Sequence, residues 1–325
     1  PLLFPSTYFC FAKALSMSSA GTERWERTMS GNLFKYAPGG ANVGFVSGKF
    51  PSRKVVVHVG GLTDGLLPLP YTAAMGEVLE RNGWALVQPL LSSSHLGYGI
   101  SSLQKDADEI DLLLSYLARK WDWDADKDKS DDTSVVIVGH STGCQDAVWH
   151  NKHGRERERV TGLVLQGPVS DRDYAETVPQ AVKMLPVAQQ LLATDVPDAL
   201  MPKEADYCGI GAPMTAYRYN SLVGRLGDDD MFSNDLTEAE LAQALGHVQV
   251  PCLLAFSHDD EYVPANVDKE ALGRRIAAAM PRGRPVFLPG DHALYSEQGQ
   301  AELLQALEDF LREVAPTVPT KAEGP

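Results

Sequence analysis

Short apolar runs alternate with longer amphipathic segments along most of the chain. The runs are rich in β-branched residues and predict buried strands near 33–37, 42–48, 54–59, 84–88, 134–138, 160–166, 250–256 and 284–288. The amphipathic segments repeat apolar residues at helical spacing and predict helices near 68–82, 102–121, 142–151, 265–280 and 297–313. This alternation, which follows an initial hairpin, predicts an α/β fold with a doubly wound, mostly parallel sheet of about eight strands.

One long segment interrupts the alternation. It contains helical and loop material without strong strand signals, so we expect an inserted helical cap over the carboxyl end of the sheet. The expected organisation is an N-terminal extension (1–30), a core in two parts (31–173 and 248–314), the cap insertion (174–247) and a flexible tail (315–325).

Gly139-His140-Ser141-Thr142-Gly143 lies between a predicted buried strand and a predicted helix. Strand, Gly-x-Ser-x-Gly, helix is the nucleophile elbow of α/β-hydrolases, in which the serine projects from a sharp turn. We therefore predict that Ser141 is a nucleophile and that the Thr142 N–H, at the helix N-terminus, faces a developing oxyanion. The alternative is an ordinary strand-to-helix turn rich in small residues.

A serine nucleophile needs a base, and the base needs a carboxylate that fixes its tautomer. In α/β-hydrolases these follow in the chain order serine, acid, histidine. His292 follows a predicted strand and Pro289-Gly290, and is the candidate base. Asp260 follows the strand near 250–256 and is the candidate acid, with Asp259 as its near rival and Asp171 as a more distant one. Each of these residues could instead cap a loop or turn.

A glycine-rich loop, Gly60-Gly61-Leu62-Thr63-Asp64-Gly65, follows the predicted strand at 54–59. This is the position from which α/β-hydrolases supply a second oxyanion donor. We expect the Leu62 N–H to be that donor, with Gly61 next. His58 lies earlier, inside the strand, and is interpreted as a structural residue whose ring is hydrogen-bonded.

The chain has 325 residues, 44% of them hydrophobic, and a formal net charge of −14. The size suits one large domain with an inserted cap. The charge argues against nucleic-acid or anionic-membrane partners and mildly favours neutral or cationic substrates. No stretch is long enough to span a bilayer.

The sequence gives no sign of a metal or cofactor site. The cysteines, Cys10, Cys144, Cys208 and Cys252, are scattered and suggest reduced thiols. Asp228-Asp229-Asp230 carries no histidine at ligand spacing, so we expect a structural role, capping the following segment or pairing with Arg218 or Arg225.

Residues 2–16 are fairly apolar and Ser18-Ser19-Ala20 could be a cleavage site, but a basic leader is absent and Pro5 interrupts the run. We expect a cytoplasmic protein, with targeting by this segment left open.

Several stretches resemble a family of α/β-hydrolases best known through fungal siderophore esterases that hydrolyse fusarinine C. They are the loop 60–65, Ser92–Gly99, Gly139–Asp146, Gln166–Arg172, Thr215–Tyr219 and Gly227–Ser233. The resemblance implies a Ser–Asp–His esterase whose motif positions are Ser141, Asp260 and His292.

We therefore expect a serine hydrolase that acts on a soluble, small-to-medium ester, with a rate that rises through roughly pH 6–7 as a histidine base loses its proton. The predicted cap is too polar for a lipase lid. The alternatives are a non-catalytic binding role for the same scaffold, or acyltransferase or amidase activity. The oligomeric state is left open.

Overall fold

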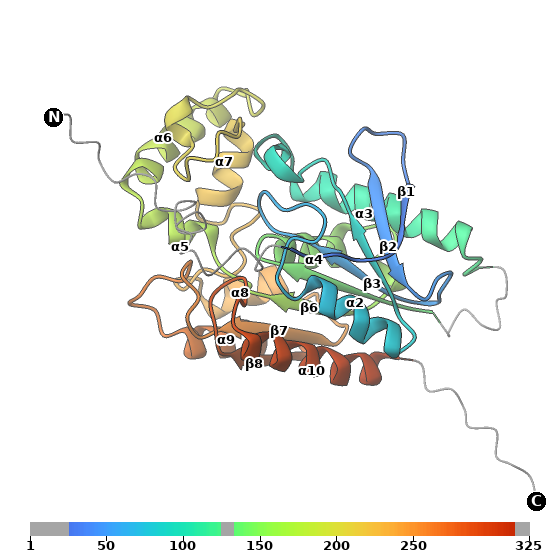
Figure 1. Ribbon diagram of the computed structural model, residues 1–325. Coiled ribbons are helices and arrows are strands. Elements are labelled where there is room, and N and C mark those ends of the chain that lie inside the picture. Colours follow the sequence, from blue (N-terminus) through green and yellow to red (C-terminus); the bar gives the residue numbers. More distant parts are fainter. Residues whose placement is uncertain (1–25, 125–132, 316–325) are drawn as a thin grey trace, which may run out of the picture.

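The computed structural model describes residues 26–124 and 133–315, and its centre is an eight-stranded sheet (Figure 1). The strands are β1 (Asn32–Lys35), β2 (Val43–Gly48), β3 (Lys54–Val59), β4 (Ala85–Pro89), β5 (Ser134–His140), β6 (Val160–Gln166), β7 (Cys252–Ser257) and β8 (Gly283–Leu288). Their spatial order is β1-β2-β4-β3-β5-β6-β7-β8. β1 and β2 pair antiparallel, and β3 to β8 are parallel. The predicted doubly wound sheet is confirmed. The predictions for residues 1–25, with Cys10 and the apolar segment, and for the tail beyond 315 lie outside the described residues.

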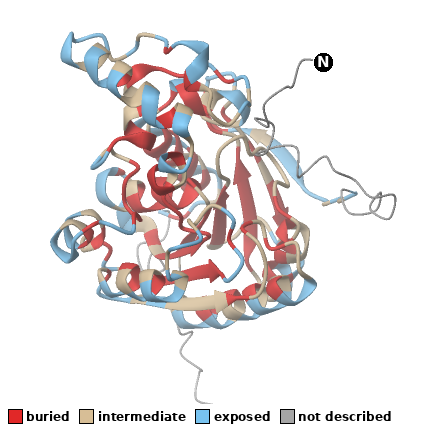
Figure 2. Ribbon diagram, turned by 90° about the vertical axis from the view of Figure 1, so that its left-hand side faces the viewer, coloured by how far each residue is buried: buried red, intermediate tan, exposed pale blue. Residues whose placement is uncertain are grey.

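Helices cover both faces of the sheet because its central strands are apolar on both sides. Val55 and Val57 pack in one buried cluster with α3 (Leu103–Lys120), α4 (Gly143–His153) and α9 (Lys269–Ala278). Val56 points to the opposite face, where α2 (Thr72–Arg81) and α10 (Glu297–Val314) pack. Figure 2 shows the resulting buried layer of strands between helices whose outer faces are exposed. Buried strands of this kind give continuous apolar runs rather than alternating ones.

A separate group of helices lies over the carboxyl end of the sheet (Figure 1). It consists of α5 (Asp171–Glu176), α6 (Pro179–Ala193) and α7 (Ala216–Val223), which share an apolar cluster of their own. Leu62 of the glycine-rich loop packs against this cluster, so the cap directly contacts the predicted oxyanion loop. α8 (Glu238–Leu245) behaves differently, because its Leu241 and Leu245 belong to the core cluster under the sheet. Short 3-10 helices occur at His95–Ile100, Arg157–Arg159 and Lys203–Ala205.

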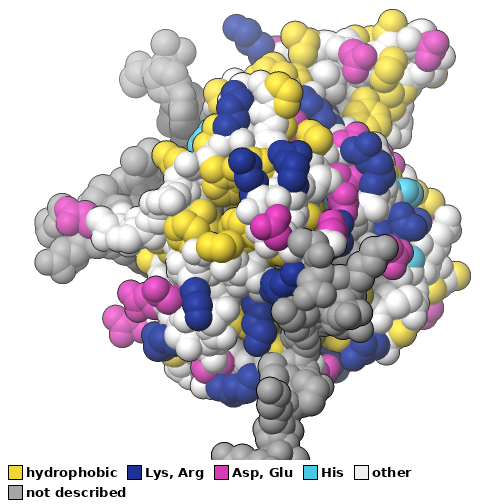
Figure 3. Space-filling view, turned by 90° about the vertical axis from the view of Figure 1, so that its right-hand side faces the viewer, with side chains coloured by type: hydrophobic (Ala, Val, Ile, Leu, Met, Phe, Trp, Pro, Cys, Tyr) yellow, Lys and Arg dark blue, Asp and Glu magenta, His cyan; other side chains and the backbone are white. Residues whose placement is uncertain are grey.

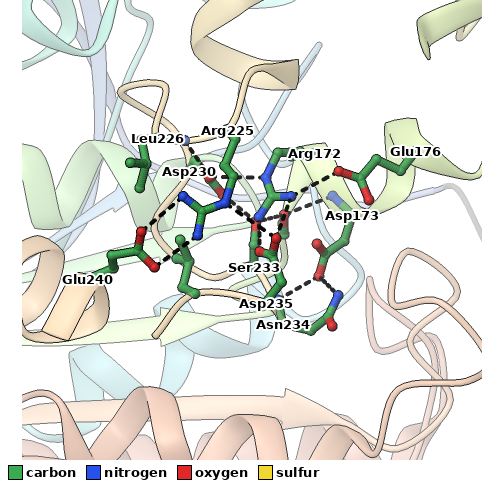
Figure 4. Close-up of polar contacts among 12 residues, drawn as sticks. Arg172, Asp173, Glu176, Arg225, Leu226, Asp230, Ser233, Asn234, Asp235 and Glu240 are labelled. Atoms are coloured by element: carbon green, nitrogen blue, oxygen red, sulfur yellow. Dashed lines mark hydrogen bonds and ion pairs between the residues drawn. The ribbon is translucent and has the colours of Figure 1, made fainter. Parts of the chain in front are cut away.

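A buried arginine joins the first cap helix to the loop before α8 (Figure 4). Arg172 donates from Nε to Asp230 at 3.0 Å and from Nη1 to Glu176 at 2.9 Å, and it also pairs with Asp235. The neighbouring Asp173 accepts from the backbone and side chain of Asn234, each at 2.8 Å. Because a buried charge is costly unless it is paired, these contacts fix how the loop leaves the cap.

The aspartate run is part of the same structural network. Asp229 accepts from Arg218 at 2.6 Å, which confirms one of the predicted pairings, and Asp228 accepts from the Tyr217 hydroxyl. Arg225 pairs with Glu240 at 2.9 Å rather than with this run. Within the described residues, no group of three or more histidine, cysteine or acidic side chains is placed to hold a metal ion.

The surface is mixed in charge despite the negative total. On the face that Figure 3 shows, lysine and arginine side chains are interspersed with acidic and apolar ones. None of the helices in the described part of the chain combines the length and apolar composition that crossing a bilayer requires.

Candidate active site

Ser141 occupies the sharp turn between β5 and α4. Its φ angle is +52°, in the left-handed region that a side chain with a Cβ adopts only under strain. The turn is held by two backbone hydrogen bonds, from the Ser141 N–H to the Gln166 carbonyl at 3.0 Å and from the Cys144 N–H to the Ser141 carbonyl at 2.9 Å. Ser141 is partly exposed whereas its neighbours His140 and Thr142 are buried. The geometry is that of the predicted elbow.

The two glycines of the motif are required by close packing. A Cβ on Gly139 would lie 2.2 Å from the Gly143 carbonyl oxygen, and one on Gly143 would lie 2.4 Å from the Val59 carbonyl oxygen. Both obstacles are backbone atoms, which cannot move aside cheaply. The motif is therefore needed sterically to bring the start of α4 against the end of β3.

His292 and Asp260 form a buried pair on loops that follow β8 and β7. The His292 Nδ1 lies 2.8 Å from Asp260 Oδ2, and the two side chains are 7% and 3% exposed. Asp260 Oδ1 accepts from the Tyr262 N–H at 3.0 Å, so both carboxylate oxygens are engaged. His292 Nε2 is buried and has no hydrogen-bond partner within the described part of the chain. An imidazole that donates from Nδ1 to a carboxylate presents Nε2 as a proton acceptor.

Asp259 and Asp171, the alternative candidates for the acid, have other bonding partners. Asp259 is exposed, and its N–H donates to the Gly290 carbonyl at 3.0 Å. Asp171 accepts from the Gln145 side chain at 3.1 Å, and burial raises its pKa to about 7. Of the three candidates, the structure brings Asp260 to His292.

A polar network that the sequence analysis did not predict connects the serine turn to the histidine loop. Gln166, at the end of β6, donates from Nε2 to the His292 carbonyl at 2.9 Å. Its Oε1 accepts from the Tyr71 hydroxyl at 2.8 Å and from His140 Nδ1 at 2.6 Å. Because the Gln166 carbonyl also accepts from the Ser141 N–H, one residue holds both the serine and the histidine backbone.

Aromatic rings enclose the imidazole of His292. The Tyr262 ring meets it edge to face at 4.7 Å between centroids, and the His140 ring lies at 4.8 Å. These rings limit rotation of the imidazole and exclude water from its flanks.

The buried histidines differ in the direction in which their surroundings shift their pKa values. Burial opposes charging of His292, but the adjacent Asp260 carboxylate outweighs it and raises the pKa of His292 above its ordinary value. Burial lowers the pKa of His140 well below its ordinary value, and lowers that of His58 to about 4. His140 and His58 are therefore neutral near neutral pH. His58 lies buried inside β3 as expected, but the expectation that its ring is hydrogen-bonded is wrong, because neither ring nitrogen has a partner among the described residues.

The glycine-rich loop lies directly against the nucleophile. A Cβ on Gly61 would lie 2.6 Å from the Ser141 Cβ, so only glycine fits there. The Gly61 N–H, however, donates to Asp64 Oδ2 at 2.7 Å. This corrects the expectation that Gly61 offers an oxyanion donor, because its N–H is already engaged. The N–H groups of Leu62 and Thr142 have no hydrogen-bond partner among the described residues.

A groove of about 470 Å³ opens beside Asp260, between α5 and the loop after β7. Tyr174 and Thr177 line it from the cap, and Asp260 and Tyr262 line it from the core. The groove therefore lies at the boundary between cap and core and reaches Asp260, the partner of His292.

Known proteins that are similar to this chain include esterases. The chain is 29% identical over 299 residues to Esterase AN6793 of Emericella nidulans. This match covers 75% of this chain and 79% of the esterase. It is 29% identical over 261 residues to the fusarinine C esterase sidJ of Aspergillus fumigatus, with coverage of 67% and 73%. The solved siderophore hydrolase EstB of Aspergillus fumigatus superposes with a TM-score of 0.71 at 25% identity, over 89% of this chain and 98% of that one.

These likenesses confirm the α/β-hydrolase fold and an esterase-like relationship to siderophore esterases. The model of the family described as "Protein of unknown function (DUF1749)" matches residues 22–311, and the chain belongs to that family.

Proposed function

We propose that the protein is a serine ester hydrolase in which Ser141, His292 and Asp260 form the catalytic triad. The observation that carries the proposal is the buried Asp260–His292 bond at 2.8 Å, which leaves Nε2 unpartnered. Gln166 ties the backbone of this histidine to Ser141, whose φ is left-handed. The esterase relatives support the same reaction class.

The mechanism follows from these positions. His292 Nε2 takes the proton of the Ser141 hydroxyl as Oγ attacks the ester carbonyl carbon, and Asp260 stabilises the imidazolium that forms. The carbonyl oxygen gains negative charge, and the Leu62 and Thr142 N–H groups stabilise it by donating hydrogen bonds to it. The tetrahedral intermediate collapses, and His292 returns the proton to the departing alcohol. His292 then removes a proton from water as the water attacks the acyl-enzyme carbonyl. The proton returns to Ser141 Oγ as the carboxylic acid leaves.

Helix α4 adds to the stabilisation of the oxyanion. The Thr142 N–H lies at its N-terminus, where unpaired N–H groups carry partial positive charge. Removing one donor from such a site costs about 10²–10³ in rate.

For the substrate, we propose a soluble small-to-medium ester held at the boundary between cap and core. The names of the relatives direct the first trials toward siderophore-type esters. The exposed large aliphatic side chains of the cap are Val182, Val196, Leu200 and Leu226, and scattered single residues of this kind are ordinary on protein surfaces.

The test is hydrolysis of 4-nitrophenyl butyrate by the wild type and by Ser141→Ala. We expect turnover by the wild type and a loss of at least about 10³-fold in the variant. A variant that keeps wild-type turnover would refute the assignment of Ser141, and an inactive wild type toward a broad ester panel would refute the reaction class.

A further inference from the structure

A small polar cavity lies next to the glycine-rich loop and is lined by the residues of both proposed oxyanion donors. Leu62 and Thr142 line it together with four charged side chains, Asp64, Asp106, Asp146 and Arg218. Its volume is about 20 Å³, which accommodates one water-sized group. The cavity brings together side chains from α3, α4 and the cap helix α7.

Acidic side chains outnumber basic ones in the lining of this cavity. Arg218 is the one cation that lines it among the described residues, and its guanidinium is bonded elsewhere. It donates from Nη1 to Asp229 at 2.6 Å and from Nε to the Tyr98 carbonyl at 3.1 Å. Asp106 and Asp146 thus face the cavity without a cation in direct contact, although both are more than nine-tenths buried.

Asp146 is the less satisfied of the two. Its Oδ1 is buried and has no hydrogen-bond partner in the described structure, whereas Asp106 accepts from the Ser101 hydroxyl at 3.1 Å. The two carboxyl groups lie close enough to interact, and two carboxylates satisfy each other only when one of them carries a proton. Burial raises the pKa of Asp106 to about 6 and that of Asp146 well above its ordinary value.

This arrangement is unfavourable for the oxyanion as it stands. A negative charge beside the oxyanion donors opposes the charge that develops on the substrate, so the carboxyl pair must be neutralised during turnover. A proton can do this, and so can a cation that the substrate carries. A primary ammonium has three N–H donors and the size of one water molecule, which matches the acceptors and the volume.

We infer that this cavity binds a primary ammonium group of the substrate through Asp146 and Asp106, and that the enzyme therefore selects cationic esters over neutral ones. The inference rests on the proposed ester hydrolysis. Bulkier cations do not fit: guanidinium and quaternary ammonium groups exceed the volume of the cavity. The ammonium displaces the shared proton, and the oxyanion donors then act beside a neutral ion pair.

The test compares two aryl esters with acyl chains of equal length, 4-nitrophenyl 6-aminohexanoate and 4-nitrophenyl heptanoate. We expect the wild type to favour the ammonium ester by about tenfold to a hundredfold in kcat/KM, the range for a hydrogen-bonded charge pair. Asp146→Asn should abolish this preference. Asp108→Asn, which removes an exposed charge from α3, should retain it.

A second measurement does not depend on where the amine is attached or on a variant that folds. n-Butylammonium should inhibit wild-type hydrolysis of 4-nitrophenyl butyrate competitively, and n-butanol at the same concentration should not. Equal inhibition by the two compounds, or an ammonium preference that survives in Asp146→Asn, would overturn the inference. Hydrolysis of the heptanoate that depends on Ser141 but shows no ammonium preference would overturn the inference while leaving the proposed function intact.

Discussion

Replacing Asp260 by asparagine should reverse the tautomer of His292 and nearly abolish catalysis. In the native protein Asp260 Oδ1 accepts from the Tyr262 N–H at 3.0 Å, and Oδ2 lies 2.8 Å from His292 Nδ1. The asparagine amide will keep its oxygen toward the Tyr262 N–H, so its NH₂ group will face His292 Nδ1. Because both Nδ1 and the amide would otherwise donate, the imidazole proton must move to Nε2. A protonated Nε2 cannot accept the serine proton.

The expected loss in kcat is about 10⁴-fold, which corresponds to about 5.5 kcal/mol of transition-state stabilisation. The assay is turnover of 4-nitrophenyl butyrate by purified Asp260→Asn, with Asp259→Asn as the matched control. The carboxylate of Asp259 is exposed and His292 pairs with Asp260 instead, so the Asp259 variant should stay within about twofold of wild type. An Asp260→Asn enzyme with more than a tenth of the native kcat, or an equal loss in Asp171→Asn, would refute the reasoning.

The same pair sets the pH dependence of the wild type. The reaction needs neutral His292, so kcat/KM rises as pH increases through the pKa of its imidazolium form. Burial alone would lower that pKa, but Asp260 raises it above the ordinary value of about 6.5, so the midpoint should lie above that pH. In Asp260→Asn the raising charge is absent, and the midpoint of the residual activity should move to lower pH. A wild-type midpoint well below pH 6.5 would contradict this account.

Three further predictions follow from the packing around the site. Gln166→Leu removes the hydrogen bonds that hold His292 and should lower kcat about tenfold to a hundredfold with little change in KM, measured with the same ester; an unchanged kcat would show that the network does not position the base. Gly143→Ala places a Cβ against the Val59 carbonyl and should destabilise the protein by about 1–3 kcal/mol in urea unfolding, whereas Gly40→Ala, with open space around it, should not; equal stabilities would contradict the steric argument. Short-chain aryl esters should be hydrolysed faster than emulsified long-chain triglycerides, and strong activation at the lipid interface would instead indicate a lipase.

The order and type of the core elements could be predicted from the sequence because the physical signals are local. Apolar runs such as Lys54–Val59 and Cys252–Ser257 are buried on both faces, and short continuous runs of this kind are typical of central strands in a parallel sheet. Helix ends were less accurate: the helix expected from 265 begins at Lys269, because the Asp268 side chain accepts from the Ala271 N–H and caps it there. The sequence also predicts the tight turn at Ser141 and the loop positions of Asp260 and His292, because each directly follows an apolar run that predicts a strand.

Other features of the site depend on contacts between residues that are distant in the chain or within irregular loops, and the spacing of residue types along the sequence does not predict such contacts. Nothing local to Gln166 indicates that its side chain reaches His292, 126 positions away in the chain. The engagement of the Gly61 N–H by Asp64 depends on how the loop folds back on itself. The Asp106–Asp146 cavity combines residues from α3 and α4 with Arg218 of the cap, so it exists only in the assembled fold.

The most direct test of the central claim is covalent labelling with a fluorophosphonate, which reacts with a serine that an adjacent base activates. The account predicts one equivalent of label on the wild-type protein, located by peptide mapping at Ser141, and no label on Ser141→Ala. Label on another serine, or an unlabelled wild type that is folded and monodisperse, would contradict it.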